Sequence, residues 1–463
     1  MTLIKSISGI RGTIGGQVGE NLTPIDAVKF ASAYGMWIKQ QRNKKDYTVV
    51  VGRDARISGE MIQSLVMNTL VGMGIHVVDL GLSTTPTVEV AVPMEHADGG
   101  IILTASHNPK QWNALKLLNH KGEFLNDTDG KEILRLAESD TIEFSDVDSL
   151  GKITINQAYI DMHIDEVLNL PLVNKKAIEK AKFKVVVDGV NSTGGIAIPL
   201  LLERLGVHAV KLYCDPTGHF PHNPEPLKEH LTDLSEKVVK EHADFGIVVD
   251  PDVDRLAFVS EDGEMFGEEY TLVACTDYVL SNTPGNTVSN MSSTRALRDV
   301  TEKHGGVYEA SAVGEVNVVE LMKQNNAIIG GEGNGGIIYP ELHYGRDALV
   351  GVALFLSLLA DKKIKVSELR STYPSYFMSK NKIQLTPGLD VDGILKEMEK
   401  CYSHENITTI DGVKIDFPDN WVHLRKSNTE PIIRIYTEAK SQQEADDLAI
   451  KIMSEIKEIA GID

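Results

Sequence analysis

The chain has 463 residues, of which 42% are hydrophobic and 24% are charged, and it carries a formal net charge of -20 at pH 7. Because a single hydrophobic core stops growing near about 250 to 300 residues, this length excludes one domain and predicts three or four. The acidic charge excludes nucleic acid and anionic membranes as general partners, so a phosphate site would have to be a local basic pocket.

The cysteines and the apolar runs indicate where the protein works. Its three cysteines, Cys214, Cys275 and Cys401, are far apart and odd in number, which disfavours a disulfide framework and a Cys-based zinc site. The sequence has no run of about 18 apolar residues, and its first residues lack the apolar stretch of a signal peptide. We therefore expect a cytoplasmic protein that binds neither membrane nor nucleic acid; the sequence leaves its oligomeric state open.

One pattern of predicted elements recurs along the chain: a short apolar strand, a polar turn, an amphipathic helix, a glycine-containing turn and a second strand. The three copies span 49–78, 185–210 and, more weakly, 287–308. Strands that alternate with helices at this spacing are typical of βαβ units in mostly parallel sheets. We therefore predict three tandem mixed-sheet α/β domains of related topology.

The last part of the chain has a different pattern. A strand is predicted over 432–436, and the helix after it would bury an apolar face. That face is formed by Leu448, Ile452, Ile456 and Ile459. A small α+β domain is expected here. The four domains are placed at residues 1–152, 153–257, 258–370 and 371–463.

A candidate nucleophile follows the strand-like residues 100–103. Residues 104–110 form a polar, turn-forming cluster, which would lie at the carboxyl edge of a parallel sheet, where open α/β folds bind ligands. Ser106 would be well presented there, although a helix cap or an Asx turn would use the same residues. Asn113 and Lys116 downstream add a polar group and a possible proton carrier.

Three aspartates, Asp250, Asp252 and Asp254, occupy alternate positions directly after the apolar run 246–249. Carboxylates at this spacing repel one another unless a cation compensates them, and hard divalent cations prefer oxygen ligands. Mg²⁺ is favoured over Ca²⁺ because three protein oxygens leave positions for water and a phosphate. The spacing does not fit an EF-hand, and a solvated acidic turn is the ordinary alternative.

Two further segments supply groups that bind sugar and phosphate. Residues 330–336 contain five glycines, and Glu332 between them is a group that accepts hydrogen bonds from vicinal hydroxyls. Residues 425–431, followed by Arg434, combine guanidinium groups, hydroxyls and backbone N–H groups, which are the components of a phosphate cradle. Each segment alone would also suit a surface turn. The sequence has neither a P-loop nor a dinucleotide-binding fingerprint.

These four segments, together with 8–12 and 52–54 near the start of the chain, resemble the α-D-phosphohexomutase family, which includes phosphoglucosamine mutases and phosphomannomutase/phosphoglucomutases. The likeness covers essentially the whole chain. It implies four domains around a central cleft, each of which supplies a loop. It also implies an isomerase that moves a phosphoryl group within one phosphosugar, through a hexose 1,6-bisphosphate that also serves as activator.

The resemblance implies roles for individual residues. Ser106 would be carried as phosphoserine, and it would hold Mg²⁺ together with the three aspartates. The expected catalytic group is Ser106, His107, Lys116 and Arg11, with Lys116 and Arg11 as candidates for general acid/base or transition-state roles. A lysine among other cations can have its pKa lowered toward neutrality. The expected substrate-binding residues are Arg255, Glu332, Asn334, Arg425, Ser427, Asn428, Thr429 and Arg434.

The choice of sugar depends on shorter strings. Residues 331–336 and 339–340 are similar to those of phosphoglucosamine mutases, whereas residues 427–429 resemble those of phosphomannomutases. Gly336 stands where many family members have histidine, and Glu315 stands where some have another histidine, which leaves the general base and the sugar preference open. Glucosamine 6-phosphate is the favoured substrate, and mannose or glucose phosphate is the alternative. A phosphosugar phosphatase and a non-catalytic sugar-phosphate sensor are more remote readings.

Overall fold

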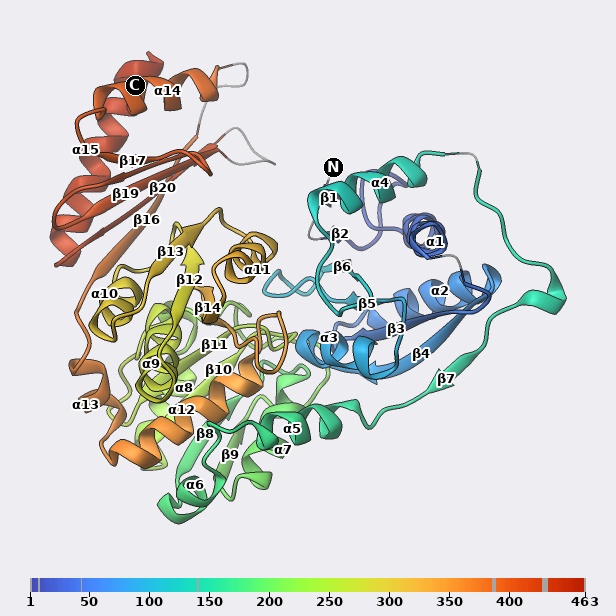
Figure 1. Ribbon diagram of the computed structural model, residues 1–463, viewed down its shortest axis with the longest axis horizontal. Coiled ribbons are helices and arrows are strands. Elements are labelled where there is room, and N and C mark those ends of the chain that lie inside the picture. Colours follow the sequence, from blue (N-terminus) through green and yellow to red (C-terminus); the bar gives the residue numbers. More distant parts are fainter. Residues whose placement is uncertain are drawn as a thin grey trace.

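The computed structural model of the protein describes residues 2–6, 9–42, 44–139, 141–384, 389–426 and 432–461. Within these ranges the chain forms four β-sheets in succession, and helices pack against each of them (Figure 1). Three α/β domains are followed by an α+β domain, which confirms the fold class predicted from the sequence. No helix in the described part of the chain combines the length and the apolar character needed to cross a membrane.

The first sheet has seven strands, and its order brings distant segments of the sequence side by side. Along the sheet these are β1 (Ile4–Ser6), β2 (Gly9–Thr13), β6 (Trp112–Leu118), β5 (Gly99–Leu103), β3 (Tyr47–Arg53), β4 (Ile75–Leu82) and β7 (Ile153–Ile155). β3, β4, β5 and β7 run parallel, whereas β1, β2 and β6 add antiparallel pairs. The helices are α1 (Pro24–Gln41), α2 (Gly59–Gly72), α3 (Thr85–Met94) and α4 (Asp127–Ala137).

The second and third domains each contain a sheet of four strands. The second sheet consists of β11 (Leu256–Ser260), β10 (Phe245–Val249), β8 (Lys184–Asp188) and β9 (His208–Leu212), with helices α5 (Tyr159–Asn169), α6 (Lys175–Ala181), α7 (Gly194–Arg204) and α8 (Thr232–Lys240). The third consists of β13 (Tyr308–Ser311), β12 (Asn286–Asn290), β14 (Ala327–Glu332) and β15 (Gly336–Ile338). Its helices are α9 (Glu268–Asn282), α10 (Ala296–Lys303), α11 (Glu315–Gln324), α12 (Ala348–Lys362) and α13 (Val366–Ser371).

The predicted recurrence of strand, helix and strand is confirmed. β3, α2 and β4 form the first copy, β8, α7 and β9 the second, and β12, α10 and β13 the third. In each copy the two strands pair in parallel, as a βαβ crossover requires. The carboxyl ends of the strands therefore face one edge of each sheet, which is where the polar loops begin.

The last domain carries an antiparallel sheet. Its strands in order are β16 (Phe377–Gln384), β20 (Ile432–Ala439), β19 (Trp421–Lys426), β18 (Val413–Asp416) and β17 (Asn406–Thr408), covered by α14 (Val391–Cys401) and α15 (Gln442–Ala460). Leu448, Ile452 and Ile456 of α15 pack into this domain's core as predicted. Ile459 was expected in the same face, but its side chain is 36% exposed because it lies in the final turn, where the helix runs to its end at Ala460.

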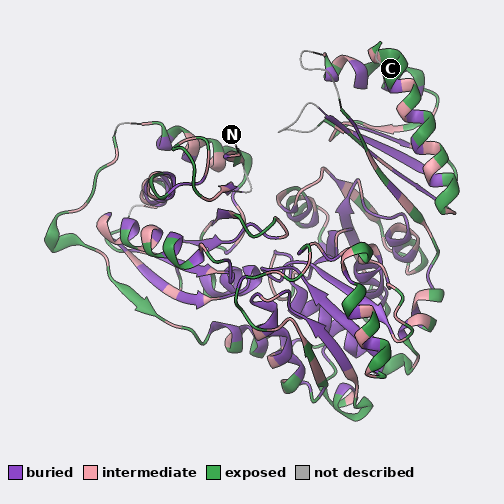
Figure 2. Ribbon diagram, turned by 180° about the vertical axis from the view of Figure 1, so that it is seen from behind, coloured by how far each residue is buried: buried purple, intermediate pink, exposed green. Residues whose placement is uncertain are grey.

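One hydrophobic core runs through the second and third domains (Figure 2). Every residue of α12 from Ala348 to Ala360 is buried, as expected for a helix that is apolar on all sides. Phe355 of α12 stacks on Phe258 of β11, with their ring centroids 3.8 Å apart. Since α12 belongs to the third domain and β11 to the second, these two domains are held together by packing as dense as that inside one domain.

Side-chain caps fix the starts of two helices that lie near the candidate site. Thr84 accepts a hydrogen bond from the N–H of Thr87 at the start of α3, and Asp347 accepts from the N–H groups of Leu349 and Val350 at the start of α12. Caps of this kind are each worth about 0.5–2 kcal/mol. They therefore hold the preceding loops, as well as the helices, in fixed positions.

Candidate active site

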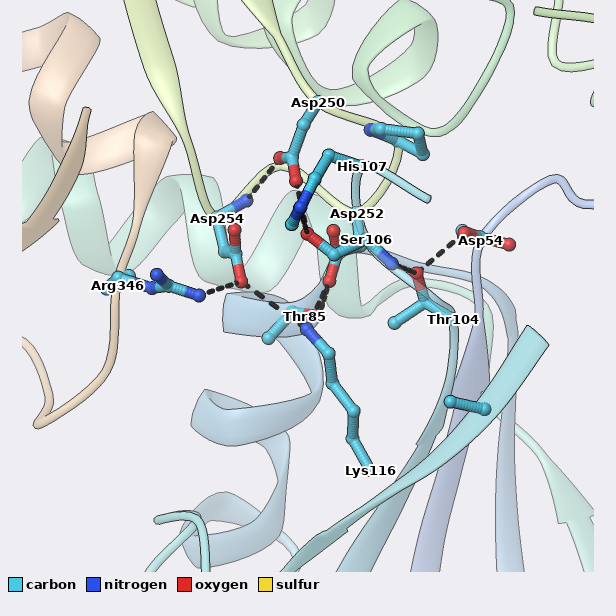
Figure 3. A network of polar contacts seen from close by, with 12 residues as sticks. Asp54, Thr85, Thr104, Ser106, His107, Lys116, Asp250, Asp252, Asp254 and Arg346 are labelled. Atoms are coloured by element: carbon cyan, nitrogen blue, oxygen red, sulfur yellow. Dashed lines mark hydrogen bonds and ion pairs between the residues drawn. The ribbon is translucent and has the colours of Figure 1, made fainter. Parts of the chain in front are cut away.

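Loops from the first and second domains meet at Ser106 and the three aspartates (Figure 3). Ser106 follows β5 and the aspartates follow β10, so both lie at carboxyl ends of strands, where open α/β sheets bind ligands. The Ser106 hydroxyl donates a 2.7 Å hydrogen bond to Asp250 Oδ2. The structure thus brings the predicted nucleophile and the predicted metal ligands together.

The backbone of Ser106 adopts an unusual conformation. Its φ of 49° lies in the left-handed region that residues other than glycine seldom adopt. The Ser106 N–H donates to Thr104 Oγ1 at 2.9 Å, and the Thr104 hydroxyl donates to Asp54 Oδ2 at 2.6 Å. Conformations of this kind cost about 1–3 kcal/mol and persist where surrounding contacts hold them. Here those contacts set the direction of the Ser106 hydroxyl.

The buried guanidinium of Arg56 holds the loop that carries Ser106. Arg56 Nε lies 3.0 Å from a carboxylate oxygen of Asp54, and both side chains are fully buried. The other N–H groups of Arg56 donate to the backbone carbonyls of Ser106, Asn108, Pro109 and Trp112. A planar guanidinium has five donors in a fixed geometry, and in this loop every one of them meets an acceptor.

The carboxylates of Asp250, Asp252 and Asp254 are buried, and one oxygen of each lies within 4.8 Å of the others. Asp252 Oδ1 and Asp254 Oδ1 have no hydrogen-bond partner. Burial, and then the charges of the other two aspartates, raise the pKa of Asp250 well above its ordinary value. A set of close, buried, oxygen-only donors with unpartnered atoms fits a hard divalent cation such as Mg²⁺.

The cationic side chain of Lys116 compensates part of this negative charge. Lys116 Nζ lies 2.7 Å from Asp252 Oδ2 and 3.4 Å from Asp254 Oδ2. Burial alone would lower the pKa of Lys116, but the charges of these two aspartates raise it above its ordinary value. The pKa of Lys116 is therefore raised, whereas neighbouring cations would lower it, because the charges nearest to its ammonium group are carboxylates.

A second group of basic side chains includes His107, which contacts Ser106 directly. His107 Nδ1 lies 3.3 Å from the Ser106 hydroxyl, and Arg255 forms a 3.1 Å ion pair with Glu225. Burial, and then Arg255, lower the pKa of His107 well below its ordinary value. Burial, and then Arg255, also lower the pKa of Arg11. Arg255 contributes to both shifts, which indicates that Arg11 and His107 lie in a basic environment that suits phosphate oxygens.

Arg346 links the aspartates to the glycine-rich segment of the third domain. Its guanidinium lies 2.7 Å from Asp254, 3.1 Å from Glu315 and 2.5 Å from Glu332. Glu332 also accepts hydrogen bonds from Asn290 Nδ2 and from the backbone N–H of Gly314. The carboxylate expected to bind sugar hydroxyls is therefore buried and held by three donors.

Asn334 and the basic segment of the last domain are the remaining predicted binding residues. Asn334 Oδ1 accepts a hydrogen bond from the N–H of Gly336, which shapes the turn between β14 and β15. Arg425 forms a 2.8 Å ion pair with Asp411, whose carboxylate also accepts from the N–H of Val313. The last domain therefore contacts the turn that leads to Gly314. Among the described residues, no hydrogen bond or ion pair links Arg425 or Arg434 to Ser106. The predicted binding residues Ser427, Asn428 and Thr429 lie outside the described residues.

Four family models match the chain in succession. They are the phosphoglucomutase/phosphomannomutase alpha/beta/alpha domain I over residues 3–143, domain II over 161–263, domain III over 267–376 and the C-terminal domain over 379–455. The chain belongs to the phosphoglucomutase/phosphomannomutase family. The protein is therefore a phosphohexomutase, an isomerase, as the resemblance of its motifs predicted.

Relatives and a solved structure match this phosphohexomutase over nearly its whole length. A phosphoglucomutase/phosphomannomutase of Thermococcus kodakarensis is 35% identical over 453 residues, which are 96% of this chain and 98% of the relative. A phosphoglucosamine/phosphogalactosamine mutase of Sulfurisphaera tokodaii is 32% identical over 469 residues, or 97% of each chain. The crystal structure of a phosphoglucomutase/phosphomannomutase family protein from Burkholderia thailandensis has a TM-score of 0.84, with 25% identity and 98% coverage of both chains.

Sequence reasoning missed two arginines of the phosphohexomutase site. Arg56 holds the Ser106 loop, and Arg346 joins Asp254 to Glu332. Neither residue belongs to a cluster of reactive side chains, so neither stood out in the sequence. A weak signal was available, because each lies in or just after a Gly-Arg-Asp string, 52–54 or 345–347, near the end of a strand.

We predict that Arg56→Lys lowers the kcat of the phosphohexomutase reaction by about 100-fold, with a smaller change in KM. A lysine cannot replace five donors in one plane, so the Ser106 loop would shift, and displacements of about 1 Å at a reacting group have effects of this size. Steady-state kinetics on variants shown by circular dichroism to be folded will measure the change. Arg53→Lys is the matched control, since Arg53 contacts Gln63 and the carbonyl of Asp54. Equal kcat values for the two variants would contradict the role of Arg56.

Proposed function

We propose that this phosphohexomutase interconverts a hexose 6-phosphate and the corresponding hexose 1-phosphate through a phosphorylated Ser106. The phosphoryl group of Ser106 passes to the free hydroxyl of the substrate, which gives a hexose 1,6-bisphosphate and returns the serine to its hydroxyl form. The bisphosphate turns end for end and gives its other phosphoryl group back to Ser106. The observation that carries the proposal is the 2.7 Å hydrogen bond between Ser106 Oγ and Asp250, beside two unpartnered carboxylate oxygens.

We assign the metal site to Asp250, Asp252 and Asp254 together with an oxygen on Ser106. Mg²⁺ bound there would supply positive charge to the phosphoryl oxygens, which is the main requirement of phosphoryl transfer. The chain's own residues prepare the site: the N–H groups of Asp254 and Arg255 donate to Asp250 Oδ1, and Thr85 donates to Asp252 Oδ2. These hydrogen bonds occupy Asp250 Oδ1 and Asp252 Oδ2, so Asp250 Oδ2 and the unpartnered Oδ1 atoms of Asp252 and Asp254 would be the oxygens available to a cation.

The remaining predicted residues are proposed to bind the phosphate groups and the sugar. Lys116 and Arg11 are proposed to stabilise charge on the transferring phosphoryl group, with His107 and Arg255 beside them. The segment of Arg425, Ser427, Asn428 and Thr429, with Arg434, is proposed to bind the phosphate that does not react. Glu332 and Asn334 are proposed to contact the sugar hydroxyls. The three hydrogen bonds that Glu332 accepts leave capacity for about one more, since a carboxylate has about four acceptor sites.

Glucosamine 6-phosphate is the substrate that we propose. The glycine-rich segment 331–336 with Tyr339-Pro340 supports it, and the Sulfurisphaera relative bears a matching name. The name of the Thermococcus relative favours mannose and glucose phosphates, which remain the alternative. A phosphatase would not need both Glu332 and Arg425, and a silent sensor would be expected to lack Ser106 or one of the three aspartates; the chain has all of these residues.

We also propose the limits of the four domains and a cytoplasmic location for the protein. We propose the four domains at residues 1–152, 153–257, 258–370 and 371–463, with the first limit moved to the end of β7 (Ile153–Ile155) and the second to the end of β11 (Leu256–Ser260), because these strands pair in the first and second sheets. The thiols of Cys214, Cys275 and Cys401 are free, which is in keeping with the reducing cytoplasm.

A coupled assay with glucosamine 6-phosphate, mannose 1-phosphate and glucose 1-phosphate tests the choice of sugar. Each reaction is started with Mg²⁺ and a trace of hexose 1,6-bisphosphate, and kcat/KM is compared. We expect the highest value for glucosamine 6-phosphate. A higher value for mannose or glucose phosphate would move the assignment to the alternative, and steady release of inorganic phosphate would overturn the mutase.

Ser106→Ala is expected to lower turnover by about 10⁴-fold, because the variant lacks the oxygen that accepts the phosphoryl group. The same variant should take up no radioactive phosphate from labelled hexose 1,6-bisphosphate. Ser260→Ala, which alters another buried serine in β11, is the matched control and should keep both properties. Phosphate incorporation into the Ser106→Ala protein would disprove the nucleophile.

Arg425→Ala is expected to raise the KM for the 1-phosphate and for the 6-phosphate alike, by about 10- to 100-fold. A hydrogen bond to a charged group is worth about 1.5–3 kcal/mol, and both ends of the sugar would use this residue in turn. Initial rates measured in both directions give the two constants. Arg135→Ala, which removes an exposed arginine of α4, serves as control. An effect on one isomer alone would be inconsistent with reorientation.

A further inference from the structure

A second cluster of metal-ligating side chains lies where the first three domains meet. His163 comes from α5, and His343 and Asp347 lie between β15 and α12. One atom from each of these three side chains lies within 4.8 Å of the others. The helix α5 packs against both α3 and α12, so the cluster sits between elements that are distant in the sequence.

The atoms of this cluster converge as metal ligands do. His163 Nε2 lies 2.9 Å from Asp347 Oδ2, and His343 Nε2 lies 3.3 Å from the same oxygen. In a tetrahedral zinc site with bonds of about 2.0–2.1 Å, neighbouring ligand atoms are separated by about 3.3 Å. The observed spacing is therefore close to that of a coordination polyhedron.

The Nδ1 atom of each histidine lies near a side-chain oxygen, with hydrogen-bonding geometry for His163 but not for His343. His163 Nδ1 lies 3.0 Å from the hydroxyl of Thr87, and His343 Nδ1 lies 3.3 Å from Glu89 Oε2. Histidines that bind metals almost always donate their second N–H to such an acceptor, often a carboxylate. With protons on both Nδ1 atoms, the two Nε2 lone pairs and an oxygen of Asp347 point at one place, and a cation between them removes their repulsion.

Glu89 provides an independent observation. Its side chain is 1% exposed, and neither carboxylate oxygen has a hydrogen-bond partner, although Oε2 is directed at His343. Buried polar atoms without a hydrogen-bond partner are uncommon, and a cation bound at His343 Nε2 would place positive charge on the ring that lies beside this carboxylate.

Asp347 is well placed to be a rigid ligand. Its Oδ1 caps α12 through the N–H groups of Leu349 and Val350, which leaves Oδ2 for the histidines. A metal-free network of hydrogen bonds among the two histidines and Asp347 is the competing description, and the metal content of the protein distinguishes the two.

We propose that the phosphohexomutase has a second metal site, in which Zn²⁺ is bound by His163 Nε2, His343 Nε2 and Asp347 Oδ2, with a fourth position open to water. Two imidazoles and one carboxylate suit zinc, whereas Mg²⁺ takes oxygen ligands. The site is distinct from the aspartates around Ser106, which offer oxygen alone. It ties α5 of the second domain to the loop before α12, beside α3 of the first domain.

Metal analysis of the full-length protein tests the proposal without any use of turnover. The chelator-treated protein is incubated with Zn²⁺ in the presence of excess Mg²⁺, passed through a desalting column and analysed by mass spectrometry for metal content. We expect about one zinc per chain in the wild type and a loss of at least about tenfold in retained zinc for the double variant His163→Gln, His343→Gln. Asp254→Asn, which changes the other cluster, and His76→Gln, which changes a histidine of β4, should retain zinc.

Zinc X-ray absorption of the wild-type protein covers the case in which the double variant does not fold. We expect two imidazole nitrogens and carboxylate or water oxygens, at about 2.0–2.1 Å. A wild type that keeps no stoichiometric zinc, or a folded double variant that keeps as much as the wild type, would overturn the site in favour of the metal-free network. A spectrum with sulfur ligands, or without imidazole, would do the same.

Discussion

Arg346 is the side chain on which the arrangement of the site depends most. It contacts Asp254 from the second domain and Glu315 and Glu332 from its own, and all four side chains are buried. Removing one partner of such an ion pair costs about 3–5 kcal/mol, because the charge left behind has neither water nor a counter-ion. The planar fork of the guanidinium also fixes where each carboxylate lies, so the position of the glycine-rich segment follows from that of the aspartates.

The negative charge of the three aspartates explains why cationic side chains gather near Ser106. Three aspartates within 4.8 Å of one another are compatible with burial only if positive charge is close. Lys116 and Arg346 supply part of it from the sides, and a bound cation would supply the rest. Arg56 has a different task, since its donors are used on backbone carbonyls of the serine loop. The charges that balance the aspartates and the contacts that shape the loop are thus separate, although both rely on buried arginines.

The sequence was sufficient to predict the helices, strands and turns that are determined by short, local patterns of residues. The apolar runs at 49–51 and 185–187 and the turns after them follow periodic patterns, and the structure has the expected parallel pairs there. Ile459 was misplaced because periodicity alone does not show how far a helix stays covered by its sheet. The family motifs indicated Ser106 and the aspartates, but their contact bridges 144 residues and depends on how two domains pack. The charge state of Lys116 and the convergence of His163 with His343 depend on the same packing, for which short strings carry no signal.

The shared core around α12 has a consequence for how this fold can be divided. Because α12 is buried on every side, none of its faces is suited to contact with water. Cutting the chain between β11 and α9 would therefore expose apolar surface on both fragments. The second and third domains therefore have to be transferred together. A chimera that received only one of them would expose apolar surface and would be insoluble. The first and last domains have cores of their own and are the parts that recombination can exchange.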